Sequence, residues 1–402
     1  MNRPLKKIGM ALFCACLILG SSQAPGQTQE KRFRIALFTP RNDEFWTLYA
    51  NIAKAACEDL GMDLEWHPAM NKPERQLADV KAVLSRPGPK IDAMVYKNFD
   101  GTAGEIMALA EKAKVYSLMV EEGYTDAELE KYGVPRSKFK YWIGEFLPDN
   151  QDGGFEQTKV LVRLAHQKHR LDKHQQIQMA VVAGNMVEGS STERVLGMHI
   201  ALQEYREVLL HQIVAGYWKK AVAYRKTQRL LQDYPELSTY WTGNDTMPQG
   251  VYQAVKDYRA KHPAYPQAII GGSGSTPPAG FDVETDRIQV TVGGPFLLSA
   301  FSMVLLHDFL HGIDFAEEST TMRLCFYVFT RENVHAYTST LGKAEWNKVN
   351  FARFSKHLNP GLTKYDFGFG QVLEQFKALP DPMRISEFSG IKNESLGSKI
   401  AQ

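Results

Sequence analysis

Beyond its first two dozen residues, this chain contains no long apolar run, no excess of charge and little cysteine. Its 402 residues include 47 basic and 45 acidic side chains, a formal net charge of +2 at pH 7. A balance this even gives no electrostatic reason to expect nucleic acid or an acidic membrane as a partner. Hydrophobic residues make up 44% and charged residues 23%, which is typical of a globular chain long enough for two lobes with separate cores.

Cysteine is scarce. Two of the four cysteines, Cys14 and Cys16, lie close to the N-terminus, which leaves Cys57 and Cys325 in the body of the chain. These two could form one disulfide in an oxidising compartment, although they are far apart in the sequence. Two isolated cysteines are a still weaker indication of a metal site.

The N-terminus has the pattern of a secretory signal peptide. Three basic residues precede an apolar run over residues 8–19, and small residues follow at 20–24. The run is short for a membrane span, so we expect a signal peptide over residues 1–22, with the cleavage point left open. No later segment is apolar enough for a transmembrane helix. The mature chain is therefore expected outside the cytoplasm, in the periplasm of a cell with two membranes.

Residues 35–66 predict a strand–loop–helix–strand unit around which the rest of the chain is organised. Residues 35–38 are an apolar run, typical of a strand buried on both faces of a parallel sheet. Turn formers follow, and apolar residues then recur at helical spacing over 45–60 before Gly61 ends the helix. The next strand begins at Leu64.

The same alternation of strands and helices continues along the chain and predicts an α/β fold with parallel sheets. A polar, glycine-rich stretch at residues 148–154 divides it into two Rossmann-like lobes. Strands are expected in the first lobe at 35–38, 64–66, 93–96, 115–120 and 141–143, and in the second at 177–183, 209–215, 238–242, 268–270 and 288–292. Helices are expected at 45–60, 74–84, 102–113, 155–167, 192–205, 222–232, 251–258 and 296–311.

The chain is expected to cross between the lobes again near its C-terminal end, through an extended run at residues 320–329. We therefore divide it into an N-terminal lobe of residues 32–148 and 296–324 and a C-terminal lobe of residues 149–295 and 325–379. The second of these includes a helical appendage, with helices expected near 333–341, 350–358 and 370–379. Residues 380–402 are polar and are expected to form a loose tail.

Polar loops follow the strands of both lobes, and in open α/β sheets ligands bind outside the carboxyl ends of the strands. The loop at residues 42–46 places hydrogen-bonding groups beside Phe45 and Trp46. That mixture suits a polyol or sugar, because rings cover C–H faces while polar groups hold hydroxyls. The alternative is that the two rings only attach the following helix to the core.

Several short segments, in this order and spacing, resemble the ribose-type (class I) periplasmic sugar-binding proteins over residues 33–335. They are Asn42, Phe45 and Trp46 after the first strand, then Ser191-x-x-Arg194-x-x-Gly197-Met198, Gly243-Asn244-Asp245 before a helix, and Thr330-Arg331-Glu332-Asn333-Val334. The resemblance implies two lobes joined by hinge strands that close around one small ligand. It also implies a monomeric binding protein that is not an enzyme, holds no metal or cofactor, and passes a sugar-like ligand to a membrane partner.

The resemblance also implies a set of ligand-binding residues. Phe45 and Trp46 would stack on the ligand from the first lobe and Trp218 from the second. The ligand's polar groups would be bound by Asp43, Asn98 or its neighbour Lys97, Arg194, Asn244 and Asp245. Each has a simpler interpretation: Asp43 as a turn former, Arg194 as a surface arginine, and Asn244 or Asp245 as a helix N-cap.

The chain departs from the ribose-type pattern at three polar positions. Glu121 follows the strand where an Asp-Arg pair is usual, Ser273 replaces an Asp, and Gly293 or Gly294 replaces a Gln. The glycine-rich residues 271–275 are more similar to the quorum-sensing autoinducer receptor branch, which binds a furanosyl diol or its borate ester. Two functions therefore stay open: delivery of a sugar to an ABC permease, or a sensory co-receptor for a membrane histidine kinase or cyclase.

Enzymatic and metal sites are poorly supported. The Gly271–Gly274 segment has neither the last glycine nor the His and Asp partners of a nucleophile elbow, nor the lysine of a phosphate-binding loop. His307 and His311 are four residues apart on a helix, but no third metal ligand has a clear spacing. We therefore expect no enzyme, no metal and no cofactor.

Overall fold

The structure, a computed structural model, describes residues 32–376 and 391–392. The described residues from Phe33 onward belong to one compact unit. The signal peptide expected at residues 1–22 lies outside the described residues, and so does most of the tail expected at 380–402. No helix in the described part of the chain is both long and apolar enough to span a bilayer.

The first lobe is built on a seven-stranded sheet with the order β13-β11-β5-β4-β3-β1-β2. Its strands are β1 (Arg34–Thr39), β2 (Asp63–Pro68), β3 (Ala93–Lys97), β4 (Tyr116–Val120), β5 (Trp142–Pro148), β11 (Thr321–Leu324) and β13 (Ile391–Lys392). All pairings are parallel except that of β13 with β11.

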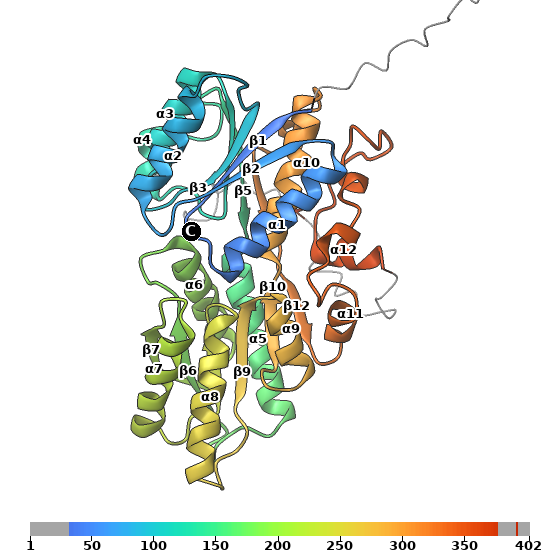
Figure 1. The fold of residues 1–402 in the computed structure, drawn as a ribbon. Helices are drawn as coiled ribbons and strands as arrows, with labels where there is room; N and C mark the ends of the chain where they lie inside the picture. Colours follow the sequence, from blue (N-terminus) through green and yellow to red (C-terminus); the bar gives the residue numbers. More distant parts are fainter. Residues whose placement is uncertain (1–31, 377–390, 393–402) are drawn as a thin grey trace, which may run out of the picture. The chain divides into compact units, whose positions relative to one another are not determined.

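Helices cover both faces of this sheet. On one side α1 (Glu44–Asp59) packs against α10 (Leu298–Leu310), and on the other α2 (Pro73–Ser85) packs against α3 (Ala103–Ala113), near the short α4 (Asp126–Tyr132) (Figure 1). Along β1, Ile35 and Leu37 belong to the core on the α1 side, whereas Ala36 and Phe38 belong to the other core. This alternation confirms a strand buried on both faces.

The second lobe is built on a six-stranded sheet with the order β12-β10-β9-β8-β6-β7, in which only β12 runs antiparallel. Its strands are β6 (Ile177–Ala183), β7 (Val208–Ala215), β8 (Thr239–Thr242), β9 (Ile269–Gly274), β10 (Val290–Gly293) and β12 (Tyr327–Thr330). Its helices are α5 (Asn150–Gln167), α6 (Gly189–Glu204), α7 (Lys220–Asp233), α8 (Thr246–Lys261) and α9 (Pro277–Glu284). Helices α5 and α6 pack as one pair, and α7 and α8 as another (Figure 1).

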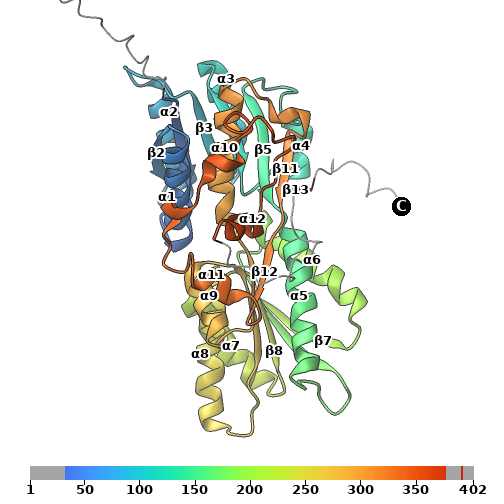
Figure 2. The same cartoon turned by 90° about the vertical axis from the view of Figure 1, so that its right-hand side faces the viewer.

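Three hinge segments connect the sheets of the two lobes, and the C-terminal segment described below contacts both lobes as well. The hinge segments are the passage from β5 into α5, the 3-10 turn η1 (Pro295–Leu297) between β10 and α10, and the run from β11 into β12, which Figure 2 shows as one nearly continuous path. Two parallel-sheet lobes joined by three hinge segments confirm the predicted fold class.

The segment after β12 contacts both lobes. Helix α11 (Val334–Thr338) packs on α9, and the Tyr337 hydroxyl donates to the Ser275 carbonyl at 3.0 Å. Two 3-10 turns, η3 (Trp346–Lys348) and η4 (Phe351–Phe354), then pack on α1 and α10 of the first lobe. Helix α12 (Phe369–Glu374) follows. Of the three helices expected here, two are present but shorter, as α11 and α12, and the one expected near 350–358 is the 3-10 turn η4. Buried aromatic side chains, rather than a helical apolar stripe, hold this segment.

Other differences have local physical causes. Helix α5 begins at Asn150 rather than 155, since the Asp149 carboxylate accepts the Asp152 N–H at 3.1 Å and caps it. Strand β9 continues through the glycines at 271–274 because Thr291 and its neighbours on β10 supply ladder partners. The periodicity missed α4 and α9, which are only 7 and 8 residues long.

Candidate functional site

One cavity of about 260 Å³ is lined by residues of both lobes, at the carboxyl ends of their strands. Seven of the eight residues predicted from the sequence line it: Asp43, Phe45, Trp46, Arg194, Trp218, Asn244 and Asp245. Its volume falls just below the range of roughly 300–1,000 Å³ that is usual for pockets holding drug-sized ligands. The cavity therefore suits a small ligand.

From the first lobe, the start of α1 supplies the aromatic wall. Asp43 caps the helix, with Oδ1 accepting the Trp46 N–H at 3.1 Å and Oδ2 accepting Arg41 Nε at 2.7 Å. Phe45 and Trp46 meet edge to face at 5.2 Å, and Trp46 is only 3% exposed. Trp46 thus packs in the core and also lines the cavity, so the two sequence interpretations do not exclude each other.

The eighth predicted residue, Asn98, is turned away from the cavity. Its Nδ2 donates to the Gly123 carbonyl at 3.1 Å, and its Oδ1 accepts the Ala103 N–H at 3.2 Å, so it ties the start of α3 to a neighbouring loop. Lys97, at the end of β3, lines the cavity instead. Successive residues of a strand point to opposite sides, which is why a one-residue register difference separates the two.

Arg194 is not a surface arginine, because it is only 7% exposed. It lies on α6, where its Nε donates to Asn150 Oδ1 at 2.9 Å and its Nη1 donates to the Gly243 carbonyl at 2.7 Å. Burial lowers the pKa of Arg194 from its usual value, while the nearby Glu121 and Asp245 oppose that shift. The guanidinium is therefore fixed in orientation at the cavity wall.

Close packing of α5 on α6 fixes the position of Arg194 along the wall of the cavity. A Cβ at Gly154 of α5 would overlap the carbonyl oxygen of Arg194, and one at Gly197 of α6 would overlap that of Gln151. Only glycine allows the two backbones to approach so closely. The predicted motif around Arg194 thus includes Gly197, the residue that lets α6 approach α5 and so positions Arg194.

Asn244 and Asp245 both have structural partners. Asn244 Oδ1 accepts the Met247 N–H at 2.9 Å and so caps α8. Asp245 Oδ2 accepts the Thr276 N–H and Oδ1 accepts the Thr291 hydroxyl, each at 2.7 Å. Burial raises the pKa of Asp245, although these hydrogen bonds work in the other direction.

Trp218 forms part of the second-lobe wall in a strained conformation. It and Tyr217 have positive φ angles of 61° and 54°, which non-glycine residues rarely adopt. The indole lies against Gly184, and its Nε1 donates to Glu188 Oε1 at 3.2 Å. Backbone strain of this kind is typical of ligand-binding positions.

Sequence reasoning treated Glu121 and Ser273 only as departures, yet both line the cavity. Glu121 has φ of 67° and is 7% exposed, and burial raises its pKa to about 8, against the attraction of Lys97. Three buried polar atoms of the lining, Glu121 Oε1, Ser273 Oγ and Trp46 Nε1, have no hydrogen-bond partner among the described residues. Their positions in the sequence could have indicated a role in binding, because Glu121 directly follows β4 and Ser273 lies near the end of β9.

Comparison with known families decides what kind of protein has this architecture. Residues 35–296, well over half of the chain, match the family model described as a periplasmic binding protein domain. The chain belongs to the periplasmic binding protein family. This confirms the family that the sequence motifs indicated; the likeness to the autoinducer branch finds no counterpart among the matches described next.

Curated and solved relatives of this periplasmic binding protein agree with that placement. The D-apiose import binding proteins of Actinobacillus succinogenes and Paraburkholderia graminis are 23% and 22% identical, covering 61% and 73% of this chain and 73% and 85% of theirs. A periplasmic sugar-binding protein from Pseudomonas fluorescens has a TM-score of 0.73 at 26% identity, covering 85% of this chain and 99% of its own. A solute-binding protein from Actinobacillus succinogenes with bound D-allose shares the fold, with a TM-score of 0.64 at 19% identity, covering 76% of this chain and all of its own.

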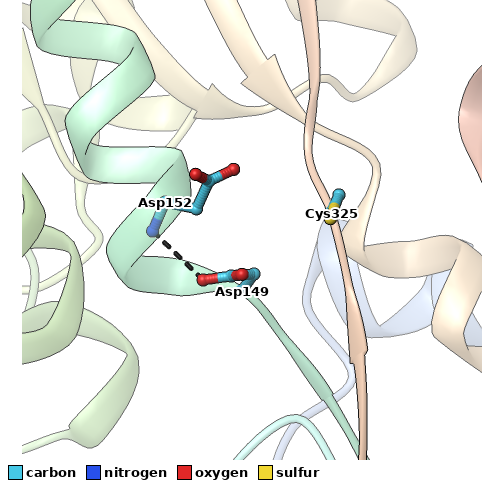
Figure 3. A group of neighbouring side chains, drawn as sticks. All are labelled: Asp149, Asp152 and Cys325. Atoms are coloured by element: carbon cyan, nitrogen blue, oxygen red, sulfur yellow. Dashed lines mark hydrogen bonds between the residues drawn. The ribbon is translucent and has the colours of Figure 1, made fainter. Parts of the chain in front are cut away.

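One group of potential metal ligands among the described residues of this binding protein has a structural explanation. Ligand atoms of Asp149, Asp152 and Cys325 lie within 4.8 Å of one another at a hinge (Figure 3). Asp149 is occupied as the N-cap of α5, and nothing else points to an ion there. Cys57 and Cys325 are both buried and are not joined to each other, so the disulfide that the sequence left open does not form.

The histidines on α10 belong to a packing network. His307 Nδ1 lies 3.0 Å from Asp308 Oδ1, and the ring of His311 stacks on His357 at 3.9 Å. Asp308 also accepts the Lys356 N–H at 2.6 Å and the Tyr365 hydroxyl at 3.0 Å. This cluster therefore attaches the C-terminal segment to the first lobe.

Proposed function

We propose that this protein is an exported binding protein of the periplasm that traps one small, uncharged, sugar-like ligand between its lobes and delivers it to an ABC permease. The observation that carries the proposal is a set of three polar atoms around one cavity, Glu121 Oε1, Ser273 Oγ and Trp46 Nε1, that have no partner within the described part of the chain. A buried polar group without a partner costs about 1–3 kcal/mol. A ligand that supplies hydroxyl groups to these atoms removes that cost.

The charges of the lining favour an uncharged ligand. Its two buried cations are already engaged, because Lys97 Nζ lies 2.7 Å from Glu122 Oε2 and Arg194 donates to Asn150 and Gly243. The carboxylates of Glu188 and Asp245 face the same space. Arg41, the third cation of the lining, is paired with Asp43 at 2.7 Å. A phosphorylated sugar would therefore meet cations that already have protein partners, whereas a polyol can donate to the carboxylates and accept from the indole and hydroxyl.

The relatives support a sugar and an import role. Two curated relatives are named D-apiose import binding proteins, and solved structures of the same fold hold D-allose or arabinofuranose. The alternative from the sequence, a sensory co-receptor for a membrane kinase or cyclase, has no such support. Closure by hinge bending would present both lobe surfaces to the permease.

Calorimetric titration of the purified protein tests the ligand class. The panel is D-apiose, D-allose, L-arabinose and myo-inositol, with furanosyl diols added with and without borate, and ribose 5-phosphate as the charged control. We expect saturable 1:1 binding of at least one neutral sugar or polyol and none of the phosphate. Binding of the phosphate alone, or heat only from the borate ester, contradicts the proposal; the second result favours the sensory role.

Delivery is tested separately, by uptake of the radiolabelled ligand in cells with the gene deleted. We expect uptake at low ligand concentration to fall and to return when the gene is restored. Unchanged uptake, together with a lost transcriptional response to the ligand, would favour the sensor.

A further inference from the structure

A hydrogen bond joins the two lobes beside the cavity. Glu122, which follows β4 in the first lobe, places its Oε1 3.0 Å from the backbone N–H of Gly189 in the second lobe. Gly189 is the first residue of α6, the helix that carries Arg194. Neither Glu122 nor Gly189 lines the cavity.

This contact supplies a hydrogen-bond acceptor to the N-terminus of α6. The first N–H groups of a helix have no partner within the helix, and the side chain at the N-cap usually accepts one of them. Here the N-cap is Glu188, whose side chain makes no capping hydrogen bond. The carboxylate of Glu122 takes that place from the other lobe, where the positive end of the helix dipole also attracts it.

Neighbouring charges hold this carboxylate in position. Lys97 of the first lobe lies 2.7 Å from Glu122 Oε2 and 3.7 Å from Glu188 Oε2 of the second, so one cation bridges two acids across the cleft. Glu188 is fixed in turn by Trp218 Nε1 at 3.2 Å and Asn185 Nδ2 at 3.1 Å. These side chains are at most 19% exposed, so solvent screens them only in part.

We propose that Glu122 is an interlobe positioning residue, which caps α6 across the cleft and thereby stabilises the closed arrangement of the lobes before a ligand binds. Its consequence for affinity rests on the proposed function, because α6 holds Arg194 at the ligand cavity. The apparent affinity of a protein for its ligand falls in proportion to the fraction of molecules that are in the binding-competent form. A protein that already populates this form without ligand therefore has a higher apparent affinity. Glu122 thus sets the ligand-free balance between open and closed forms.

The test measures that balance without ligand. Nitroxide labels are placed at the exposed Lys112 of α3 and Lys226 of α7, each changed to cysteine, in a protein in which Cys14 and Cys16 are changed to serine. Cys57 and Cys325 are buried. The protein is unfolded and refolded to remove any bound ligand, and distances between labels are measured by double electron–electron resonance. The ratio of the short to the long distance population reports closure.

Two variants remove the same hydrogen bond from opposite sides. Glu122→Ala removes the acceptor, and Gly189→Pro removes the donor. Proline is well tolerated at the first position of a helix, and Glu188 before it has the extended backbone, φ −88° and ψ 134°, that a following proline favours. The matched control is Glu130→Gln on α4, which removes one negative charge from an exposed site of the same lobe.

We expect each variant to lower the closed-to-open ratio about tenfold, and the double variant to lower it no further, while Glu130→Gln leaves it unchanged. An unchanged ratio in Glu122→Ala, or two effects that multiply in the double variant, overturns the proposal. So does a wild-type protein that is wholly open. If Glu122→Ala does not fold, the closed-to-open ratio of Gly189→Pro alone tests the proposal. Failure to bind any sugar would overturn the proposed function and leave this result intact.

Discussion

At the scale of single residues, Glu121 has the most unusual environment in the cavity. Its carboxyl group is buried, its Oε1 has no partner among the described residues, and its φ angle is 67°. Burial raises its pKa from 4.5 to about 8, although Lys97 and Arg194 lower it. The folded protein therefore holds this proton more tightly than the unfolded chain does.

This pKa shift predicts how stability changes with pH. Because the folded-state pKa is raised, ionising Glu121 costs stability progressively as pH rises from about 4.5 toward 8. We expect Glu121→Gln, which stays neutral, to lose less stability over that range and to melt roughly 5 °C above wild type at pH 8. Thermal unfolding at pH 5 and pH 8 checks this, with Glu130→Gln as the control. Parallel pH profiles for Glu121→Gln and wild type would contradict it.

A second residue-scale prediction concerns Ser273. Its hydroxyl is buried at the cavity and has no hydrogen-bond partner among residues 32–376. Ser302 on α10 is equally buried and also lacks a partner there, but it does not line the cavity. We expect Ser273→Ala to weaken ligand binding about tenfold, the effect of losing one hydrogen bond of about 1 kcal/mol or more. Ser302→Ala should leave affinity unchanged, and neither variant should lose stability. Titration calorimetry with equal affinities for the two would remove Ser273 from the site.

At the scale of elements, the sequence predicted the helices and strands that have a clear hydrophobic periodicity. It missed the features that depend on contacts between residues far apart or on capping hydrogen bonds. Strands such as residues 35–38 and 177–183 were recognisable because both faces are apolar. The early start of α5 depends on the Asp149 cap, and the glycine at position 154 of α5 depends on the backbone of α6. Neither is visible in hydrophobic spacing.

The close pairing of α5 and α6 gives a prediction at this scale. Gly154→Ala would drive a methyl group into the carbonyl of Arg194, whereas a Cβ at Gly361 meets nothing within 4 Å. We expect Gly154→Ala to cost about 1–3 kcal/mol, as overpacking does, and also to weaken ligand binding, because Arg194 must shift. Denaturant unfolding and calorimetry measure the two effects. A Gly154→Ala protein as stable as Gly361→Ala would contradict the interpretation.

At the scale of the whole molecule, the cavity needs residues from both lobes, and this is where prediction from the sequence was weakest. Family spacing located Arg194 and Trp46, but it could not choose between Lys97 and Asn98, because one residue of register decides which of them faces the cavity. The link from Glu122 to Gly189 joins segments 67 residues apart, and no local pattern marks it.

The network around Asp308 gives a prediction for the whole molecule. Burial raises the pKa of Asp308, but hydrogen bonds from His307, Ser355, Lys356 and Tyr365 together bring it below its usual value. Its contribution to stability is therefore present at neutral pH and is lost as pH falls below about 4. We expect Asp308→Asn to cost about 2–3 kcal/mol at pH 7 and much less at pH 3. Urea unfolding at both pH values tests this, with the exposed Asp366→Asn as control; a cost independent of pH would contradict it.

The C-terminal segment also bears on the order in which the protein can fold. The Phe351 N–H donates to the Asp59 carboxylate at 2.7 Å, across 292 residues of sequence, and η3 and η4 cover α1. Helix α1 is made early and the residues that bury its outer face are made late, so the first lobe cannot complete its core until nearly the whole chain is available. Contacts of such long sequence separation fold slowly. Until then the apolar face of α1 is exposed, which gives the nascent protein a long period in which it is open to chaperones and vulnerable to aggregation.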